Sequence, residues 1–143
     1  MRWHKTKDIS REVVDTAKLF ELLGYRMDTI DLVDGRGGEI IHNLNNPLPD
    51  RLSSVRGSYD LVFDCITNQC FNIAEAMRTA VLVCRPSGYI LHVTPVTQVN
   101  QGFYGISPTF YHDFYEANGF KIELIQHVIG NYRKRGEIGR AHV

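Results

Sequence analysis

The chain has 143 residues, enough for one domain with a buried core, and 43% of them are hydrophobic, which excludes a disordered composition. Its 16 basic and 16 acidic residues cancel, so charge gives no reason to expect binding to nucleic acid or to a membrane surface. No apolar run approaches the roughly 20 residues of a membrane-spanning helix, and the polar N-terminus lacks the apolar core of a signal peptide.

The first part of the chain predicts a helix that ends at a glycine. Ser10 is a suitable N-cap, and Gly24 supplies a C-terminal stop. Between them, apolar side chains recur at helical spacing, as one stripe of Val13, Ala17, Phe20 and Leu23. The pattern therefore predicts an amphipathic helix with one buried face.

Two strands are expected next. Residues 25–32 read as a strand that ends near Asp31, and residues 39–42 read as a second, shorter strand. The glycine-rich loop at 34–38 lacks the spacing of a dinucleotide-binding loop. Residues 43–50 contain Pro47 and Pro49, which exclude regular structure there.

Residues 59–95 predict a strand, a helix and a second strand. The apolar run at 61–63 is continuous, as in a strand that is covered on both faces. Asn72 can cap the helix, the sequence Arg-Pro-Ser-Gly at 85–88 breaks it, and residues 89–93 form the second strand. A unit of this kind places its two strands parallel, and ligands bind beyond their carboxyl ends.

The remainder predicts a loop at 96–106, a helix and a last strand. Ser107 followed by Pro108 is a typical helix start, and three aromatic side chains of that helix, Phe110, Phe114 and Tyr115, are expected to face inward. Residues 120–129 read as a strand, and residues 130–143 as an unstructured tail. The order of elements predicts an α/β fold with a doubly wound, mostly parallel sheet and helices on both faces.

Two aspartates close predicted strands at the edge where such sheets bind ligands, namely Asp31 and Asp64. A carboxylate in this place can accept hydrogen bonds from both hydroxyls of a nucleotide ribose. For each aspartate, capping of a turn or of a helix is the alternative interpretation.

Further motifs follow in a fixed order: HNLNNPLP at 42–49, YDLVFD at 59–64, RPSG at 85–88 and NQGFYGISP at 100–108. Together with Asp31 they resemble the class I S-adenosylmethionine-dependent methyltransferases, which have a Rossmann-like sheet. RPSG stands where that family has a Lys-Pro-Gly-Gly turn, and the last motif resembles a bacterial subgroup with Asn-His-Gly-Phe-Tyr before a Ser-Pro helix start. The resemblance covers about residues 10–129, and residues 1–129 are interpreted as a partial methyltransferase domain.

The resemblance implies a cofactor, S-adenosylmethionine, and methyl transfer to a small-molecule or glycan-type acceptor. The implied cofactor-binding residues are Asp31, Asn43, Leu44, Asp64, Cys65 and Ile66. Asp31 would bind the ribose, and Asn43 and Leu44 would lie beside the adenine. The implied substrate-binding residues are Gln69, Asn100, Gln101, Phe103 and Tyr104. No catalytic residue is identified.

Departures from the family favour a different interpretation. Residues 1–9 contain no glycine, so the glycine-rich loop and the first strand of the fold are expected to be missing. The sequence TNQC at 67–70 stands where relatives commonly carry Leu-Glu-His, and Gln101 replaces a histidine, which removes candidate acids and bases. Exposed strand edges would then favour self-association.

The alternatives are therefore a non-catalytic α/β binding or assembly module derived from the methyltransferase fold, and a dinucleotide-dependent oxidoreductase. The latter is less well supported, because no pyrophosphate loop is present in the sequence. The last residues, 137–143, resemble a translated DNA-sequencing adapter, which predicts that the chain is a fragment.

The isolated cysteines and histidines predict no metal site. The chain has 3 cysteines, none in a CxxC pair, and the expectation is buried thiols in a reducing cytoplasm. His42 and His92 lie in or beside strands without a second ligand at metal-binding spacing, and are interpreted as packed or turn histidines.

Overall fold

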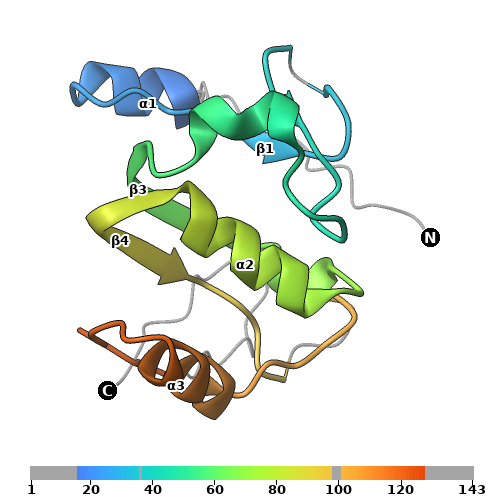
Figure 1. Cartoon of the computed structure of the whole chain (residues 1–143), viewed down its shortest axis with the longest axis vertical. Helices are drawn as coiled ribbons and strands as arrows, with labels where there is room; N and C mark the ends of the chain where they lie inside the picture. The colour runs from blue at the N-terminus through green and yellow to red at the C-terminus, as the bar shows by residue number, and fades with distance from the viewer. Residues whose placement is uncertain (1–15, 36, 98–100, 128–143) are drawn as a thin grey trace, which may run out of the picture. The chain divides into compact units, whose positions relative to one another are not determined.

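The computed structural model describes residues 16–35, 37–97 and 101–127. Contacts divide the chain into two compact units, Met1–Leu44 and Asn45–Val143, and each is described by itself. The described residues form a mixed α/β structure with two separate parallel sheets of two strands each (Figure 1). A continuous doubly wound sheet is therefore not confirmed. Within the described ranges, no helix has the length and apolar character needed to cross a membrane.

In the first unit, helix α1 spans Thr16–Leu22 and ends as predicted at Gly24, which has φ +82°. The predicted cap, Ser10, and the first residue of the apolar stripe, Val13, lie outside the described residues. The rest of the stripe is more exposed than the pattern predicts, since Leu23 is 62% exposed. The amphipathic pattern thus identifies the helix but not a buried face.

Strands β1 (Ile30–Asp31) and β2 (Ile40–Ile41) pair in parallel and are much shorter than predicted. The amide of Ile40 donates to the carbonyl of Thr29 (2.8 Å), and the amide of His42 donates to that of Asp31 (2.9 Å). A strand forms only where a partner strand accepts its hydrogen bonds, and β2 is two residues long. The predicted strand at 25–32 is therefore reduced to its last part.

The second unit contains the predicted βαβ motif. Strand β3 (Tyr59–Asp64) is followed by helix α2 (Ile73–Val83) and strand β4 (Cys84–His92), and the strands are parallel. Asn72 caps α2 as predicted, because its side chain accepts a hydrogen bond from the amide of Glu75 (3.3 Å). Two short 3₁₀ helices, η1 (Asp50–Val55) and η2 (Thr67–Gln69), flank β3.

The predicted turn at 85–88 lies inside β4 as an irregularity rather than ahead of the strand. The register pairs Tyr59 with Cys84, then shifts, and pairs Leu61 with Tyr89. Ser87 takes a positive φ of 63° within the shift, and Pro86 has no amide hydrogen to donate. The regular part of β4, from Tyr89 to His92, matches the predicted strand.

The core of the second unit lies on the inner face of α2, which packs against both strands. The buried apolar side chains of this helix are Ala76, Met77, Ala80 and Val83, and Met77 is completely buried. Along the strands and one residue beyond β4, alternate side chains remain at least 47% exposed: Leu61, Phe63, Tyr89, Leu91 and Val93. The described strands thus have one covered and one exposed apolar face, whereas the sequence predicts cover on both.

Helix α3 spans Pro108–Ala117 and begins at the predicted cap, where the side chain of Ser107 accepts a hydrogen bond from the amide of Thr109 (3.3 Å). Tyr115 is buried as predicted, but Phe110 is 37% exposed. The predicted last strand is wrong over its described part, because residues 120–127 adopt no regular structure. Its alternating apolar pattern is that of a strand, but a pattern alone provides no hydrogen-bonding partner.

Candidate active site

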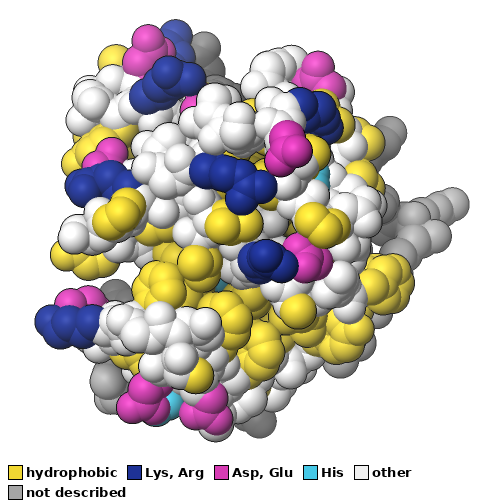
Figure 2. Space-filling model, in the orientation of Figure 1, with side chains coloured by type: hydrophobic (Ala, Val, Ile, Leu, Met, Phe, Trp, Pro, Cys, Tyr) yellow, Lys and Arg dark blue, Asp and Glu magenta, His cyan; other side chains and the backbone are white. Residues whose placement is uncertain are grey.

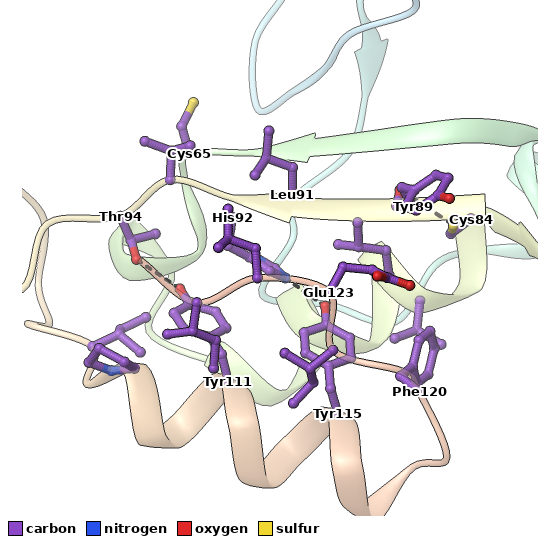
Figure 3. Close-up of a pocket in the computed structure, with 18 of the residues that line it drawn as sticks. Cys65, Cys84, Tyr89, Leu91, His92, Thr94, Tyr111, Tyr115, Phe120 and Glu123 are labelled. Carbon is purple, nitrogen blue, oxygen red and sulfur yellow. Dashed lines mark hydrogen bonds between the residues drawn. The ribbon is translucent and has the colours of Figure 1, made fainter. Parts of the chain in front are cut away.

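A buried polar network lies where β3 and β4 end. Asp64 and His92 are the last residues of their strands and face each other in the parallel register. The Nδ1 atom of His92 lies 2.5 Å from Oδ2 of Asp64, and its Nε2 atom lies 2.6 Å from the hydroxyl of Tyr115 on α3. Figure 3 shows the His92 and Tyr115 side chains pointing toward each other. Both side chains of the aspartate–histidine pair are only 8% exposed. Three elements thus meet at one chain of hydrogen bonds.

The carboxylate of Asp64 is saturated by hydrogen bonds. Its Oδ1 atom accepts from the amides of Ile66 and Thr67, each at 3.0 Å, while Oδ2 faces His92. Burial by itself would raise the pKa of Asp64, but the hydrogen bonds from His92, Thr67 and Ile66 together hold the pKa below its usual value. Asp64 therefore stays ionised and can only accept hydrogen bonds.

This ionisation fixes the direction of the remaining bonds. Because ionised Asp64 has no proton to give, Nδ1 of His92 donates to it. Burial and then the charge of Asp64 raise the pKa of Tyr115 well above its ordinary value, so this phenol keeps its proton. In the neutral form of the imidazole, Nε2 then carries no proton and accepts from the Tyr115 hydroxyl. The same order of carboxylate, imidazole and hydroxyl activates nucleophiles or bases in many enzymes.

A second tyrosine supports the imidazole from the side. The rings of Tyr111 and His92 stack with 4.6 Å between their centroids and 29° between their planes. The hydroxyl of Tyr111 forms a hydrogen bond of 3.0 Å with Oγ1 of Thr94, just beyond β4. Tyr111 and Tyr115 are four positions apart on α3, so they project from the same side of the helix toward the strand end (Figure 3).

The loop at 101–104 is attached to the segment after β3 through Asn68, which is completely buried. The backbone carbonyl of Asn68 accepts from the amides of Phe103 (2.8 Å) and Tyr104 (3.2 Å), and its side-chain amide donates to the carbonyl of Gln101. Gly102 is required between them, because it has φ +121° and a Cβ atom there would lie 2.8 Å from the carbonyl oxygen of Asn68. Two loops that are distant in sequence are therefore held together.

Two exposed phenyl rings mark the outer side of these loops. Phe71 and Phe103 stack with centroids 4.1 Å apart and planes at 13°, although they are 70% and 58% exposed. The hydroxyl of Tyr104 donates to the carbonyl of Phe71 (3.3 Å) and joins the same two segments. Phe103 and Tyr104, the aromatic side chains predicted for the acceptor site, are thus each held by a contact with Phe71.

A cleft opens between β4 and α3 in the second unit. Figure 2 shows hydrophobic side chains gathered between these elements, where the surface is hollowed. The polar network reaches this cleft, and the side chains that line it beside the network are His92, Thr94, Ile106, Tyr111, Tyr115 and Phe120. The cleft thus combines mainly apolar and aromatic walls with a few fixed polar atoms, as ligand sites commonly do.

The predicted site residues divide between the two units. Asp31 ends β1 and remains half-buried, with Oδ1 accepting from the amide of Leu32 (2.6 Å), and Asn43 and Leu44 follow β2. The residues that the structure brings together at the β3 end are Asp64, Cys65, Ile66, Gln69, Gln101, Phe103 and Tyr104. Asn100 lies outside the described residues.

The sequence-based interpretation missed three members of the network: His92, Tyr111 and Tyr115 were not predicted as site residues. His92 is packed, as expected, but the expectation overlooked a carboxylate across the strand pair. One signal was available, because both strands of a parallel pair end in an ionisable residue. The tyrosines could not be assigned, since their approach depends on how α3 packs on β4.

Comparison of the chain with protein-family models, with curated proteins and with solved structures finds no match. Among the described residues, no group of three or more histidine, cysteine and acidic side chains is arranged to hold a metal ion.

Proposed function

We propose that this chain derives from an S-adenosylmethionine-dependent methyltransferase with a doubly wound Rossmann-like sheet, and that its second unit holds the methyl acceptor, a small molecule or a glycan-type compound. S-adenosylmethionine would supply an activated methyl group. The residues of the chain would bind and orient the acceptor, exclude water and remove a proton.

One observation carries this proposal. The sequence predicts site residues separately in the segment 64–70 and in the loop 101–104. Hydrogen bonds of Asn68 hold these two segments together, beside a cleft at the carboxyl ends of parallel strands. In open α/β sheets this edge is where ligands bind. The fixed loops and the mainly apolar cleft provide the aligned, desolvated environment that a transfer reaction needs.

The donor groups fit the proposed cofactor in part. Asp31 is a half-buried carboxylate at the end of a parallel strand, which suits the two hydroxyls of a ribose. Asp64, by contrast, has its oxygens committed to Ile66, Thr67 and His92. Its role is then to orient His92 and the following turn, and neighbouring backbone groups would border the ligand.

A non-catalytic binding module remains the second candidate, and the closed network favours it. Every polar atom that links Asp64, His92 and Tyr115 already has a partner within the chain. Such a network is sufficient to fix α3 against β4 without any catalytic role, because satisfied buried hydrogen bonds specify packing. This candidate predicts ligand binding without methyl transfer.

Calorimetric titration of S-adenosylmethionine and of its demethylated product into the purified chain tests the proposal. Binding in the micromolar range that weakens at least about tenfold in Asp31→Ala would support it, because lost hydrogen bonds to a charged group cost about 1.5–3 kcal/mol. Glu21→Ala, which removes one exposed acidic side chain from the same unit, is the matched control and should bind normally. Absence of binding by a folded chain would reject the cofactor.

A further inference from the structure

We propose that Tyr115 and His92 form a proton relay that deprotonates a phenolic ligand bound in the cleft between β4 and α3. The inference rests on the proposed function only in naming that ligand as the methyl acceptor. The base that the sequence lacks at 67–70 and at Gln101 would be supplied instead from the end of β4.

The first step of the relay depends on the ability of the Tyr115 hydroxyl oxygen to accept a hydrogen bond from the ligand. A phenolic hydroxyl has one proton and two acceptor sites, and the proton of Tyr115 is directed at Nε2 of His92, 2.6 Å away. The oxygen can therefore still accept a hydrogen bond from a ligand. Tyr115 is 8% exposed and lines the cleft, so the accepting atom belongs to a nearly dry site where hydrogen bonds are strong.

The proton transfer balances without a tyrosinate. The O–H bond of the ligand breaks as its proton joins the Tyr115 oxygen, while the original Tyr115 proton passes to Nε2 of His92. The ligand oxygen becomes an anion, Tyr115 ends neutral, and His92 becomes an imidazolium whose Nδ1 proton faces the Asp64 carboxylate at 2.5 Å. The relay avoids ionising Tyr115, which burial makes unfavourable.

Groups from several elements of the second unit surround His92. Asp64 on β3 is the ionised group that faces the imidazole, and Tyr111 on α3 and Cys84 on β4 are neutral groups, since burial raises the pKa of each. Glu123 of the segment 120–127 also lines the cleft and pairs with Lys121 at 2.8 Å. The Tyr111 ring stacks on the imidazole and presents a π face to it.

The walls of the cleft select the class of ligand. Beside the relay they present the rings of Tyr111, Tyr115 and Phe120, against which a flat apolar ring packs well. A hydroxyl on that ring supplies the donor that the Tyr115 oxygen can accept. An aromatic hydroxyl is also acidic enough for an imidazole to compete for its proton, because a phenol and a histidine differ by only a few pKa units.

The test uses 4-nitrophenol, whose anion absorbs visible light, and adds no cofactor. In the wild-type chain we expect binding, and we expect the bound phenol to ionise about one pH unit below the free phenol, because the site stabilises the anion and the imidazolium together. Asp113→Asn is the matched control, since this side chain of α3 is 70% exposed and does not line the cleft. It should bind 4-nitrophenol within about threefold of the wild type and keep the shift.

Tyr115→Phe keeps the ring that lines the cleft and removes the relay oxygen, so it should bind 4-nitrophenol but lose the shift. His92→Gln is the second variant and can still donate to Asp64. It should lose the shift too, since an amide does not take up the proton. Circular dichroism checks that each variant is folded. The proposal is overturned if the wild type does not bind or shows no shift, or if either folded variant retains it. Because no cofactor is present, this outcome is independent of the cofactor titration.

Discussion

The two parallel strand pairs of this chain begin from similar sequence signals and end as very different structures. In the first unit, β1 and β2 have two residues each, and α1 contributes no buried residue. In the second, β3 and β4 pair over a longer register, and α2 covers them with Ala76, Met77, Ala80 and Val83. Pattern and capping specify where an element forms, whereas burial determines whether it extends.

The largest expected difference between the two units is the loss of stability when a side chain of the helix is truncated. Met77 is completely buried, and Met77→Ala should lower the free energy of unfolding of the second unit by about 2–5 kcal/mol, because apolar contacts are lost and the surroundings relax only partially into the cavity. Urea unfolding followed by circular dichroism measures this loss. Leu22→Ala on α1, where the leucine is 74% exposed, should change stability by less than about 0.5 kcal/mol. Equal effects of the two substitutions would contradict the contrast in burial.

Asp64 should make the second unit sensitive to acid. Its pKa is lower in the folded chain than in the unfolded one, so its stabilisation is complete above the unfolded value near 3.8 and is lost as the pH falls through the folded value. In Asp64→Asn, the free energy of unfolding should depend less on pH over this acid range. The substitution should also cost about 2–3 kcal/mol near pH 7, since hydrogen bonds to a charged group are lost.

Urea midpoints measured at a series of pH values across the acid range check this prediction. The control is Leu22→Ala, which should retain the acid dependence of the wild type. If the urea midpoint of Asp64→Asn falls with decreasing pH as in the wild type, other carboxylates account for the acid sensitivity.

The smallest expected effect concerns the loop at 101–104. Gly102→Ala forces a side chain onto a backbone with φ +121° and against Asn68, and should cost about 1–2 kcal/mol. Gly35→Ala, in the first unit, meets no atom within 4 Å and needs no positive φ, so it should be neutral or slightly stabilising. Thermal unfolding of both variants provides the comparison. Similar transitions would mean that the loop is not held against Asn68.

Local chemistry explains which parts of the fold were predictable. Asn72 and Ser107 cap their helices as the sequence predicts, because a cap depends on residues a few positions apart. The predicted strand at 120–129 depends on a distant partner, and its described part remains irregular. The residues of the turn predicted at 85–88 form an irregular part of β4, because the strand pairs with β3 again beyond them.

In the candidate site, too, features set by neighbouring residues were predictable and features set by distant contacts were not. Asp64 was predictable, since a polar residue after an apolar strand marks the edge of a parallel sheet. Its contact with His92 required the register of β3 and β4, and the contact of His92 with Tyr115 required the packing of α3. Each further bond in the network depends on one more long-range arrangement that no local pattern encodes.

The parallel pairing of β3 and β4 has a consequence for synthesis of the chain. Asp64 and His92 face each other across 28 positions of sequence, so β3 leaves the ribosome well before its partner. At about 5–20 residues per second, β3 waits a few seconds with Leu61 and Phe63 unpaired. Pairing over such a separation is intrinsically slow, so early formation of the capped helix α2 would shorten the interval in which the nascent strand is exposed to aggregation. Rare codons between β3 and β4 would lengthen that interval, and the yield of folded protein should fall accordingly.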